Sequence, residues 1–372
     1  MKHFTLTALA VAFAAAAQTA VAQAKEIRLG CYAPMTGQLA IFGQSMDSGF
    51  KLAIKDFEAT GKLKGVKIVI QCEDDQGRPD DGINIARKFV EDKSILAVLG
   101  SWSSSVTLAA GPIYNSAKLV NITPVSSHPD VTKLGPYVFR QSVVQSQEGA
   151  ANGAYLHKLG VKSIAMLGIP NDYGKANIAL TKAAFEKLGG KVVFEEMVRP
   201  DAQDFRQVLQ KAVRDKPDMV YMGVFAPQAA LMLKQLRQLG IDTSVYAAAA
   251  LDTPDLVRLA GKDATEGVHV TIQFNPVVGP KMAEFFKHYE ATYGKKPDPF
   301  AGNSYNTAMM VMGIVAAQYP NVNRESIRMG LDTIREYPDS IFGPLKYDPQ
   351  TREWPFQFYL GVIKDGQSQI VP

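Results

Sequence analysis

Short runs of Val, Ile and Leu alternate along this chain with longer stretches in which apolar residues return every three or four positions. A short apolar run predicts a buried strand, and the longer spacing predicts a helix with one apolar face. Their alternation predicts parallel sheets flanked by helices, which is an α/β fold. The strand candidates form two sets, residues 27–31, 66–72, 95–99 and 119–122, and then 164–167, 192–194, 219–222 and 268–272.

Several helices are predicted where apolar residues share one helical face. We expect these faces to pack into the core rather than to bind a cofactor. Gly240 and Gly294 follow two of the helices and are placed to end them. The faces are Met46, Phe50, Ala53 and Phe57; Phe205, Val208, Leu209 and Ala212; Ala229, Met232, Leu233 and Leu236; and Met282, Phe285, Phe286 and Tyr289.

The chain is long enough for two lobes. It has 372 residues, of which 47% are hydrophobic and 20% charged, and a domain usually takes roughly 100 to 200 residues. A polar stretch at residues 138–147 separates the two strand sets, and we predict that it is the first crossover between the lobes. The sequence contains no long Pro-, Gly- or Ser-rich linker, so we expect two lobes joined by short connections.

The N-terminus predicts export. Lys2 and His3 precede an alanine-rich apolar run at residues 4–17, which is typical of a signal peptide. Small residues at alternate positions offer cleavage near Ala22 or Ala24. A membrane anchor needs roughly 20 apolar residues, and this run is shorter. We therefore expect residues 1–24 to be removed from a secreted protein.

Charge and cysteine content narrow the partners and the compartment. The formal charge is +4, with basic and acidic residues mixed along the chain, which argues against a nucleic-acid partner. The two cysteines, Cys31 and Cys72, each end a strand candidate. If those strands are parallel neighbours, the two residues lie about 5 Å apart, within the range of a disulfide. Two buried free thiols are the alternative.

One candidate site follows the third strand candidate, because ligands of parallel sheets bind beyond the carboxyl ends of the strands. Residues 100–105 combine a glycine with Trp102 and several serines, among them Ser103 and Ser104, ahead of a predicted helix. Hydroxyl groups and free N–H groups at a helix start suit an anion such as a carboxylate. The alternative is ordinary capping of the helix by one serine, which leaves Trp102 unexplained.

A second polar loop follows the fourth strand candidate and contains Val125, Ser126 and Ser127. Two such loops on neighbouring strands predict a polar pocket. His128 lies beside them, and a secreted hydrolase using it with a nearby serine is a less favoured alternative. The sequence has no Gly-x-Ser-x-Gly nucleophile motif, so we expect a surface or turn histidine.

The second lobe offers two aromatic residues after its strands. Tyr173 and Phe225 would face the serine loops across a cleft, where they could cover a ligand, or they could pack at the loop ends. Motifs for dinucleotides, phosphates and zinc proteases are missing, and the five histidines and two cysteines show no metal-ligand spacing. We therefore predict binding without catalysis, with no cofactor and no metal.

The order of several short motifs resembles the periplasmic leucine, isoleucine and valine binding proteins, which serve branched-chain amino acid ABC transporters. The resemblance covers nearly the whole mature chain. Its motifs are Pro34-Met35-Thr36-Gly37, Phe42-Gly43, Gly100 through Ser105, Ile122-Thr123-Pro124, Asp172-Tyr173-Gly174, Leu259-Ala260-Gly261, Glu266-Gly267-Val268 and Phe342-Gly343-Pro344-Leu345.

The resemblance implies a type I periplasmic-binding fold with two Rossmann-like lobes, three hinge crossovers and closure on the ligand. The first lobe would comprise residues 25–145 and about 275–345, and the second residues 146–274 and about 346–372. It also implies a periplasmic location, a membrane permease and an ATPase as partners, and a monomer. A sensor of amides or organic acids on the same fold is the alternative.

The resemblance also assigns roles to individual residues. Ser104 and Ser127 would hold a ligand carboxylate, while Val125 and Ser126 would supply backbone groups. The apolar side would be formed by Phe42, Trp102 and Phe300 of the first lobe and by Tyr173 and Phe225 of the second.

The sequence departs from the family pattern at three points, and the first two bear on the ligand. Amino-acid-binding members carry a glutamate where this chain has Ala249, and the nearest acid in sequence is Asp252. A buried ammonium without a partner costs several kcal/mol, so we expect an aromatic or other organic acid rather than an α-amino acid. Phe225, where amino-acid binders often carry tyrosine, points the same way. The usual first-lobe disulfide is also missing, because its positions are Gly77 and Ser103.

Overall fold

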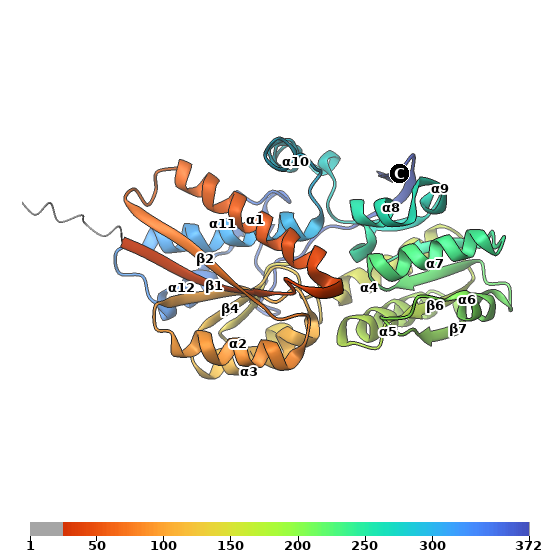
Figure 1. The fold of residues 1–372 in the computed structure, drawn as a ribbon, viewed down its shortest axis with the longest axis horizontal. Helices are drawn as coiled ribbons and strands as arrows, with labels where there is room; N and C mark the ends of the chain where they lie inside the picture. Colours follow the sequence, from red (N-terminus) through yellow and green to blue (C-terminus); the bar gives the residue numbers. More distant parts are fainter. Residues whose placement is uncertain (1–24, 372) are drawn as a thin grey trace, which may run out of the picture.

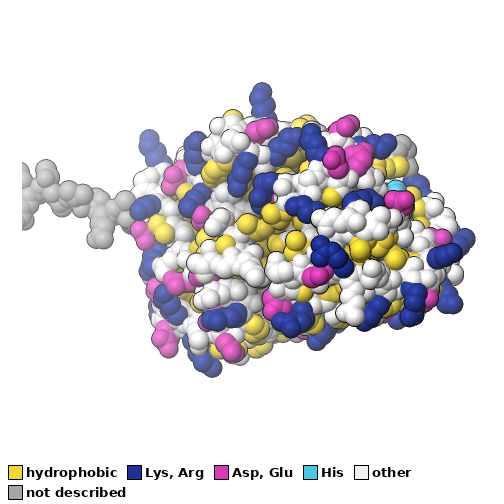
Figure 2. Space-filling model, turned by 45° about the vertical axis from the view of Figure 1, so that its right-hand side comes forward, with side chains coloured by type: hydrophobic (Ala, Val, Ile, Leu, Met, Phe, Trp, Pro, Cys, Tyr) yellow, Lys and Arg dark blue, Asp and Glu magenta, His cyan; other side chains and the backbone are white. Residues whose placement is uncertain are grey.

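The computed structural model describes residues 25–371, so the predicted signal peptide at residues 1–24 lies outside the described part. Two parallel-sheet lobes lie side by side along the long axis of the molecule (Figure 1). None of the helices in residues 25–371 is long and apolar enough to cross a membrane. Figure 2 shows basic and acidic side chains interspersed over one face of the molecule, as the sequence pattern predicts.

The first lobe is built on a five-stranded parallel sheet in the order β2-β1-β3-β4-β5. Helices α1 and α11 lie on one side of this sheet, and α2 and α3 lie on the other (Figure 1). The strands are β1 (Lys25–Ala33), β2 (Val66–Asp74), β3 (Ile95–Gly100), β4 (Val120–Thr123) and β5 (Val138–Arg140). The helices are α1 (Ala40–Ala59), α2 (Pro79–Glu91), α3 (Ser104–Ser116), α10 (Pro280–Tyr293), α11 (Pro299–Gln318) and α12 (Arg324–Thr333).

The second lobe is built on a seven-stranded sheet in the order β14-β13-β10-β9-β8-β6-β7, in which β13 alone among the described strands runs antiparallel to its neighbours β10 and β14. The strands are β6 (Ser163–Gly168), β7 (Lys191–Met197), β8 (Met219–Gly223), β9 (Ser244–Ala247), β10 (His269–Ile272), β13 (Tyr359–Lys364) and β14 (Gln367–Ile370). The helices are α4 (Gln145–Lys158), α5 (Asp172–Lys187), α6 (Arg206–Val213), α7 (Ala226–Gln238), α8 (Pro254–Ala260) and α9 (Lys262–Thr265). The short strands β11 (Glu336–Tyr337) and β12 (Leu345–Lys346) form a separate pair.

Three stretches of chain connect the elements of the two sheets. They are residues 141–144 between β5 and α4, residues 273–279 between β10 and α10, and residues 347–358 before β13. The prediction that residues 138–147 form the first crossover is therefore wrong at both ends. Val138 and Phe139 belong to a buried three-residue strand, which is too short to show a pattern, and Gln145 begins a helix. The exact boundaries of the lobes stay a prediction.

The two cysteines are joined. β1 and β2 are parallel neighbours in which Cys31 pairs with Cys72 in register. Their Cα atoms are 4.2 Å apart and their sulfurs form a disulfide. The predicted disulfide is therefore present, and the alternative of two free thiols is wrong.

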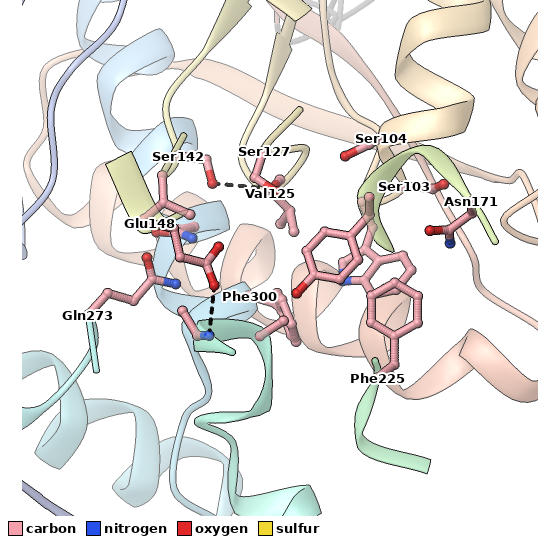
Figure 3. Close-up of a pocket in the computed structure, with 16 residues that line it drawn as sticks. Ser103, Ser104, Val125, Ser127, Ser142, Glu148, Asn171, Phe225, Gln273 and Phe300 are labelled. Atoms are coloured by element: carbon pink, nitrogen blue, oxygen red, sulfur yellow. Dashed lines mark hydrogen bonds between the residues drawn. The ribbon is translucent and has the colours of Figure 1, made fainter. Parts of the chain in front are cut away.

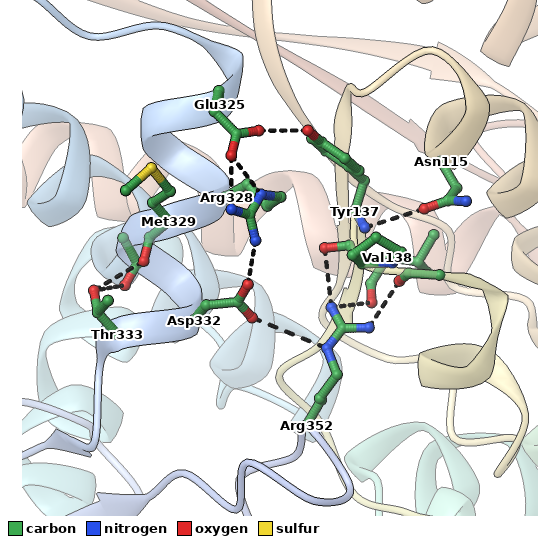
Figure 4. Close-up of polar contacts among 12 residues, drawn as sticks. Asn115, Tyr137, Val138, Glu325, Arg328, Met329, Asp332, Thr333 and Arg352 are labelled. Atoms are coloured by element: carbon green, nitrogen blue, oxygen red, sulfur yellow. Dashed lines mark hydrogen bonds and ion pairs between the residues drawn. The ribbon is translucent and has the colours of Figure 1, made fainter.

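The third connection is anchored to the first lobe by Arg352 and Glu353. The Arg352 guanidinium donates to backbone carbonyls of Thr132, Gly135, Pro136 and Val138 at 2.8–3.3 Å. It also lies 4.7 Å from the ring centroid of Phe139. Figure 4 shows Arg352 between this loop and Asp332 of α12.

The neighbouring residue, Glu353, pairs with the fully buried Arg140 at the end of β5. This connection is therefore fixed at its first-lobe end.

Candidate ligand-binding cleft

One enclosed pocket of about 40 Å³ lies between the lobes, at the carboxyl ends of strands from both sheets. Most of the residues predicted to bind a ligand line it: Trp102, Ser103, Ser104, Val125, Ser127, Tyr173, Phe225, Ala249 and Phe300. The first connection contributes Ser142 and Val143, and the second contributes Gln273. The pocket is thus formed by both lobes and by two of the stretches that join them.

Two predicted residues lie behind the pocket wall. Phe42 stacks on Trp102 with ring centroids 4.4 Å apart and an interplanar angle of 5°. Ser126 is buried, and its hydroxyl donates to the Ser101 carbonyl at 2.9 Å and contacts the Thr107 hydroxyl at 2.6 Å. Both residues support the wall from behind, and their contact with a ligand stays a prediction.

The two serine loops of the first lobe are tied together through Ser101. The carbonyl of Ser101 accepts hydrogen bonds from Thr123 at 2.7 Å and from Ser126. Its hydroxyl donates to the buried Asp75, whose pKa burial raises to about 6. Gly100 makes the turn possible, because a Cβ there would lie 2.4 Å from the Tyr32 carbonyl oxygen. The loops after β3 and β4 therefore form one unit.

The two serines at the start of α3 both line the pocket, and one of them also caps the helix. The Ser103 hydroxyl accepts a hydrogen bond from the Val106 backbone N–H at 3.5 Å and caps the helix. Helix capping, the alternative considered for this loop, therefore holds for Ser103. Ser104 is the first residue of the helix and lines the pocket. The positive end of the helix dipole and the hydroxyls of Ser104 and Ser127 make this end suited to an anion.

Aromatic rings from both lobes meet at one side of the pocket. Trp102 of the first lobe lies 4.7 Å from Phe225 of the second, measured between ring centroids, and Phe225 stacks on Tyr173 at 5.0 Å. Phe300 of α11 meets Trp102 edge-on at 6.0 Å. Such a set of rings gives this side of the pocket an apolar, aromatic lining. The pocket of about 40 Å³ is smaller than the roughly 150 Å³ cavity that accepts benzene, so a ring-sized ligand must displace rings or open the lobes.

A carboxylate that the sequence reasoning missed lines the opposite side. Glu148, in the first turn of α4, is only 2% exposed. Its Oε1 accepts a hydrogen bond from the Ala249 backbone N–H at 2.9 Å, which Figure 3 shows as a dashed line. It accepts another from the Asn177 side chain at 3.3 Å. Burial raises its pKa. The expectation that no carboxylate is available at the Ala249 position is therefore wrong.

Two other candidates lie away from this pocket. Asp252 is buried, accepts a hydrogen bond from Ser368 and lines a different groove. His128 is half-buried, and its Nδ1 accepts a hydrogen bond from the Asp130 backbone N–H at 3.2 Å. It is not among the residues that line the pocket. Within residues 25–371, no three side chains of His, Cys, Asp or Glu gather as a metal site would require.

A family model described as periplasmic binding protein matches residues 26–367. The chain belongs to the periplasmic binding protein family. This periplasmic binding protein is 27% identical over 354 residues to the leucine-specific-binding protein of Salmonella typhimurium, with 94% of each chain covered. The family expected from the motifs is thereby confirmed.

Solved structures confirm the fold. A solute-binding protein of an ABC transporter from Rhodopseudomonas palustris, in complex with 3,4-dihydroxybenzoic acid, is 26% identical with a TM-score of 0.84. The match covers 93% of this chain and 96% of that one. A leucine-binding protein from Thermotoga maritima is 24% identical, with 93% and 98% covered and a TM-score of 0.84. This periplasmic binding protein therefore has the type I periplasmic-binding fold.

Proposed function

We propose that this periplasmic binding protein captures a small carboxylate-bearing ligand in its cleft and delivers it to the permease and ATPase of an ABC transporter. One observation carries the proposal: hydroxyl groups at the start of α3 and aromatic rings from both lobes line the same pocket. A ligand there touches both lobes and so favours the closed arrangement. The Rhodopseudomonas relative, which binds a benzoic acid, and the Salmonella relative, named for leucine, support a carboxylate.

The ring contacts support a ligand with an apolar body. Trp102, Tyr173, Phe225 and Phe300 give this side of the pocket an aromatic lining, which favours an aromatic body and also suits a branched aliphatic one once the lobes have opened to admit it. In this proposal the Ser104 and Ser127 hydroxyls bind the carboxylate. The protein acts in the periplasm as a monomer without catalysis, after cleavage of the signal peptide near Ala22 or Ala24.

Thermal unfolding against a panel of acids tests the proposal. The panel contains aromatic acids, aliphatic amino acids, dicarboxylates and neutral amides. A ligand that binds only the folded protein stabilises it by about 2.7 kcal/mol at a hundredfold excess over Kd. We expect a rise in Tm with apolar monocarboxylates and none with amides.

Two matched variants locate the site. Phe225→Ala removes a ring that lines the pocket, whereas Phe286→Ala removes a ring of α10 that does not. The first should abolish the ligand-induced rise in Tm and the second should keep it. A rise that survives in Phe225→Ala, or one produced only by amides, would refute the proposed site.

A further inference from the structure

The pocket has a second polar end. Figure 3 shows Glu148 and Gln273 on the side away from Ser103, Ser104 and Asn171, with Phe300 between the two groups. The serine end offers hydrogen-bond donors to an anion. The Glu148 end offers acceptors: a carboxylate and the side-chain oxygen of Gln273, which is buried without a hydrogen-bond partner.

The Glu148 carboxylate has no positively charged group acting on it among the described residues. Its Oε1 is held by the Ala249 N–H and the Asn177 amide, which fixes the carboxylate against the pocket. The groups that act on it besides burial are the Ala249 backbone and the amides of Asn177 and Asn152, none of which carries a charge. A buried carboxylate without a cation is costly, and a donor carried by the ligand would offset that cost.

We infer that Glu148 binds a hydrogen-bond donor of the ligand, an ammonium or a hydroxyl group, at the end of the pocket away from Ser104. Gln273 adds a further acceptor on the same side of the pocket. The inference rests on the proposed function and makes Glu148 the residue that selects among carboxylates. It also replaces the earlier expectation of an acid without an amine by a requirement for a donor.

Matched pairs of acids test this, because each pair differs only in the donor. Leucine is compared with 4-methylpentanoate, phenylalanine with 3-phenylpropanoate, and 4-hydroxybenzoate with benzoate, each by isothermal titration calorimetry. The full mature protein should bind the donor-bearing member of at least one pair tenfold or more tightly than its partner.

Three variants separate the role of the Glu148 charge from its role as a hydrogen-bond acceptor and from the general effect of removing a glutamate. Glu148→Gln removes the charge and keeps an acceptor, Glu148→Met removes both, and Glu186→Gln changes an exposed glutamate of α5 as a control. If the donor is an ammonium, both Glu148 variants should lose the preference. If it is a hydroxyl, Glu148→Met should lose it and Glu148→Gln should keep most of it. In both Glu148 variants the donor-bearing acid should lose more affinity than its donor-free partner, while Glu186→Gln should bind both members of each pair within threefold of the wild type.

Other outcomes count against the inference. Equal weakening of both members of a pair in Glu148→Gln would show that Glu148 only positions the Ala249 segment. Equal binding of both members by the wild type would show that no donor is recognised. If none of these acids binds, the proposed function fails and the inference fails with it.

Discussion

Ser103 and Ser104 are neighbours in sequence with different contacts. Both line the pocket, but the Ser103 hydroxyl caps α3, whereas Ser104 is the first residue of the helix and its hydroxyl is the one proposed to bind the carboxylate. Ser103→Ala should lower the free energy of unfolding by about 1 kcal/mol, as the loss of a helix cap does. Ser104→Ala should leave stability unchanged and weaken binding of a carboxylate roughly tenfold, the effect of losing one hydrogen bond to a charged group.

Urea unfolding and calorimetric titration of both variants check this division. Because the two serines are adjacent and equal in size, the test depends on which variant loses stability and which loses binding affinity. A Ser104→Ala variant that binds the acid as tightly as the wild type would remove Ser104 from the anion end of the pocket.

Asp252 gives a pH dependence of stability. Burial raises its pKa to about 7, while an aspartate in the unfolded chain titrates near 4. Because the folded protein holds this proton more tightly, the free energy of unfolding falls as pH rises from about 4 to about 7. Asparagine does not titrate, so the Asp252→Asn variant should not lose this stability. Its free energy of unfolding minus that of the wild type should therefore rise by a few kcal/mol between about pH 4 and pH 7.

Thermal unfolding of wild type and variant between pH 4 and pH 8 measures this difference. Asp339→Asn, which changes an exposed aspartate, serves as the control and should follow the wild type. A gap between Asp252→Asn and the wild type that is the same at both ends of the range would contradict the prediction.

Most pocket residues could be predicted from the sequence because they directly follow strands. Trp102, Val125, Tyr173 and Phe225 all obey this rule. Glu148 does not, since it lies in the first turn of a helix after a connection. A glutamate at such a position is usually read as a favourable charge near a helix N-terminus, so the sequence carried no local signal for its place in the pocket.

At the scale of elements, α11 shows where hydrophobic patterning fails. Most of its 20 residues are buried, and it packs between α1 and the pocket, so no polar face marks it in the sequence. Helices with one exposed side, such as α1 and α7, were predictable from their apolar stripes. The short strands β5 and β9 were also missed, and in β5 three residues are too few to show a pattern.

The third connection provides a test at this scale. Arg140 is fully buried and pairs with Glu353. Glu353→Gln leaves that guanidinium without a counter-charge and should lower the free energy of unfolding by about 3–5 kcal/mol. Asp201→Asn breaks the solvent-exposed pair with Arg199 and should change the free energy of unfolding much less, because water screens that pair. Urea unfolding compares the two variants, and equal losses would contradict the anchoring role of Glu353.

At the scale of the whole molecule, contacts across the cleft join the two lobes. Besides the contact of Trp102 with Phe225, the Asp172 backbone N–H donates to the Ser105 hydroxyl of the first lobe at 3.3 Å. These contacts enclose a pocket of about 40 Å³, too small for a ring-sized ligand to enter without movement. Ligand exchange therefore requires the lobes to separate about their connections.

Small-angle X-ray scattering measures that movement. Saturation with a bound acid should lower the radius of gyration, because the ligand holds the two lobes together. Phe225→Ala with the same acid should stay at the ligand-free value. An identical radius of gyration with and without a tightly bound acid would show that the lobes do not move on binding.

The most direct test of the carboxylate-binding cleft compares an acid with its own primary amide. Both have the same shape, and only the acid carries a charge for the start of α3 and the hydroxyls of Ser104 and Ser127. Calorimetric titration should give a Kd for the acid at least tenfold below that of the amide, with the gap narrowed in a Ser104→Ala/Ser127→Ala variant. Equal or tighter binding of the amide would contradict a carboxylate site and favour an amide sensor on the same fold.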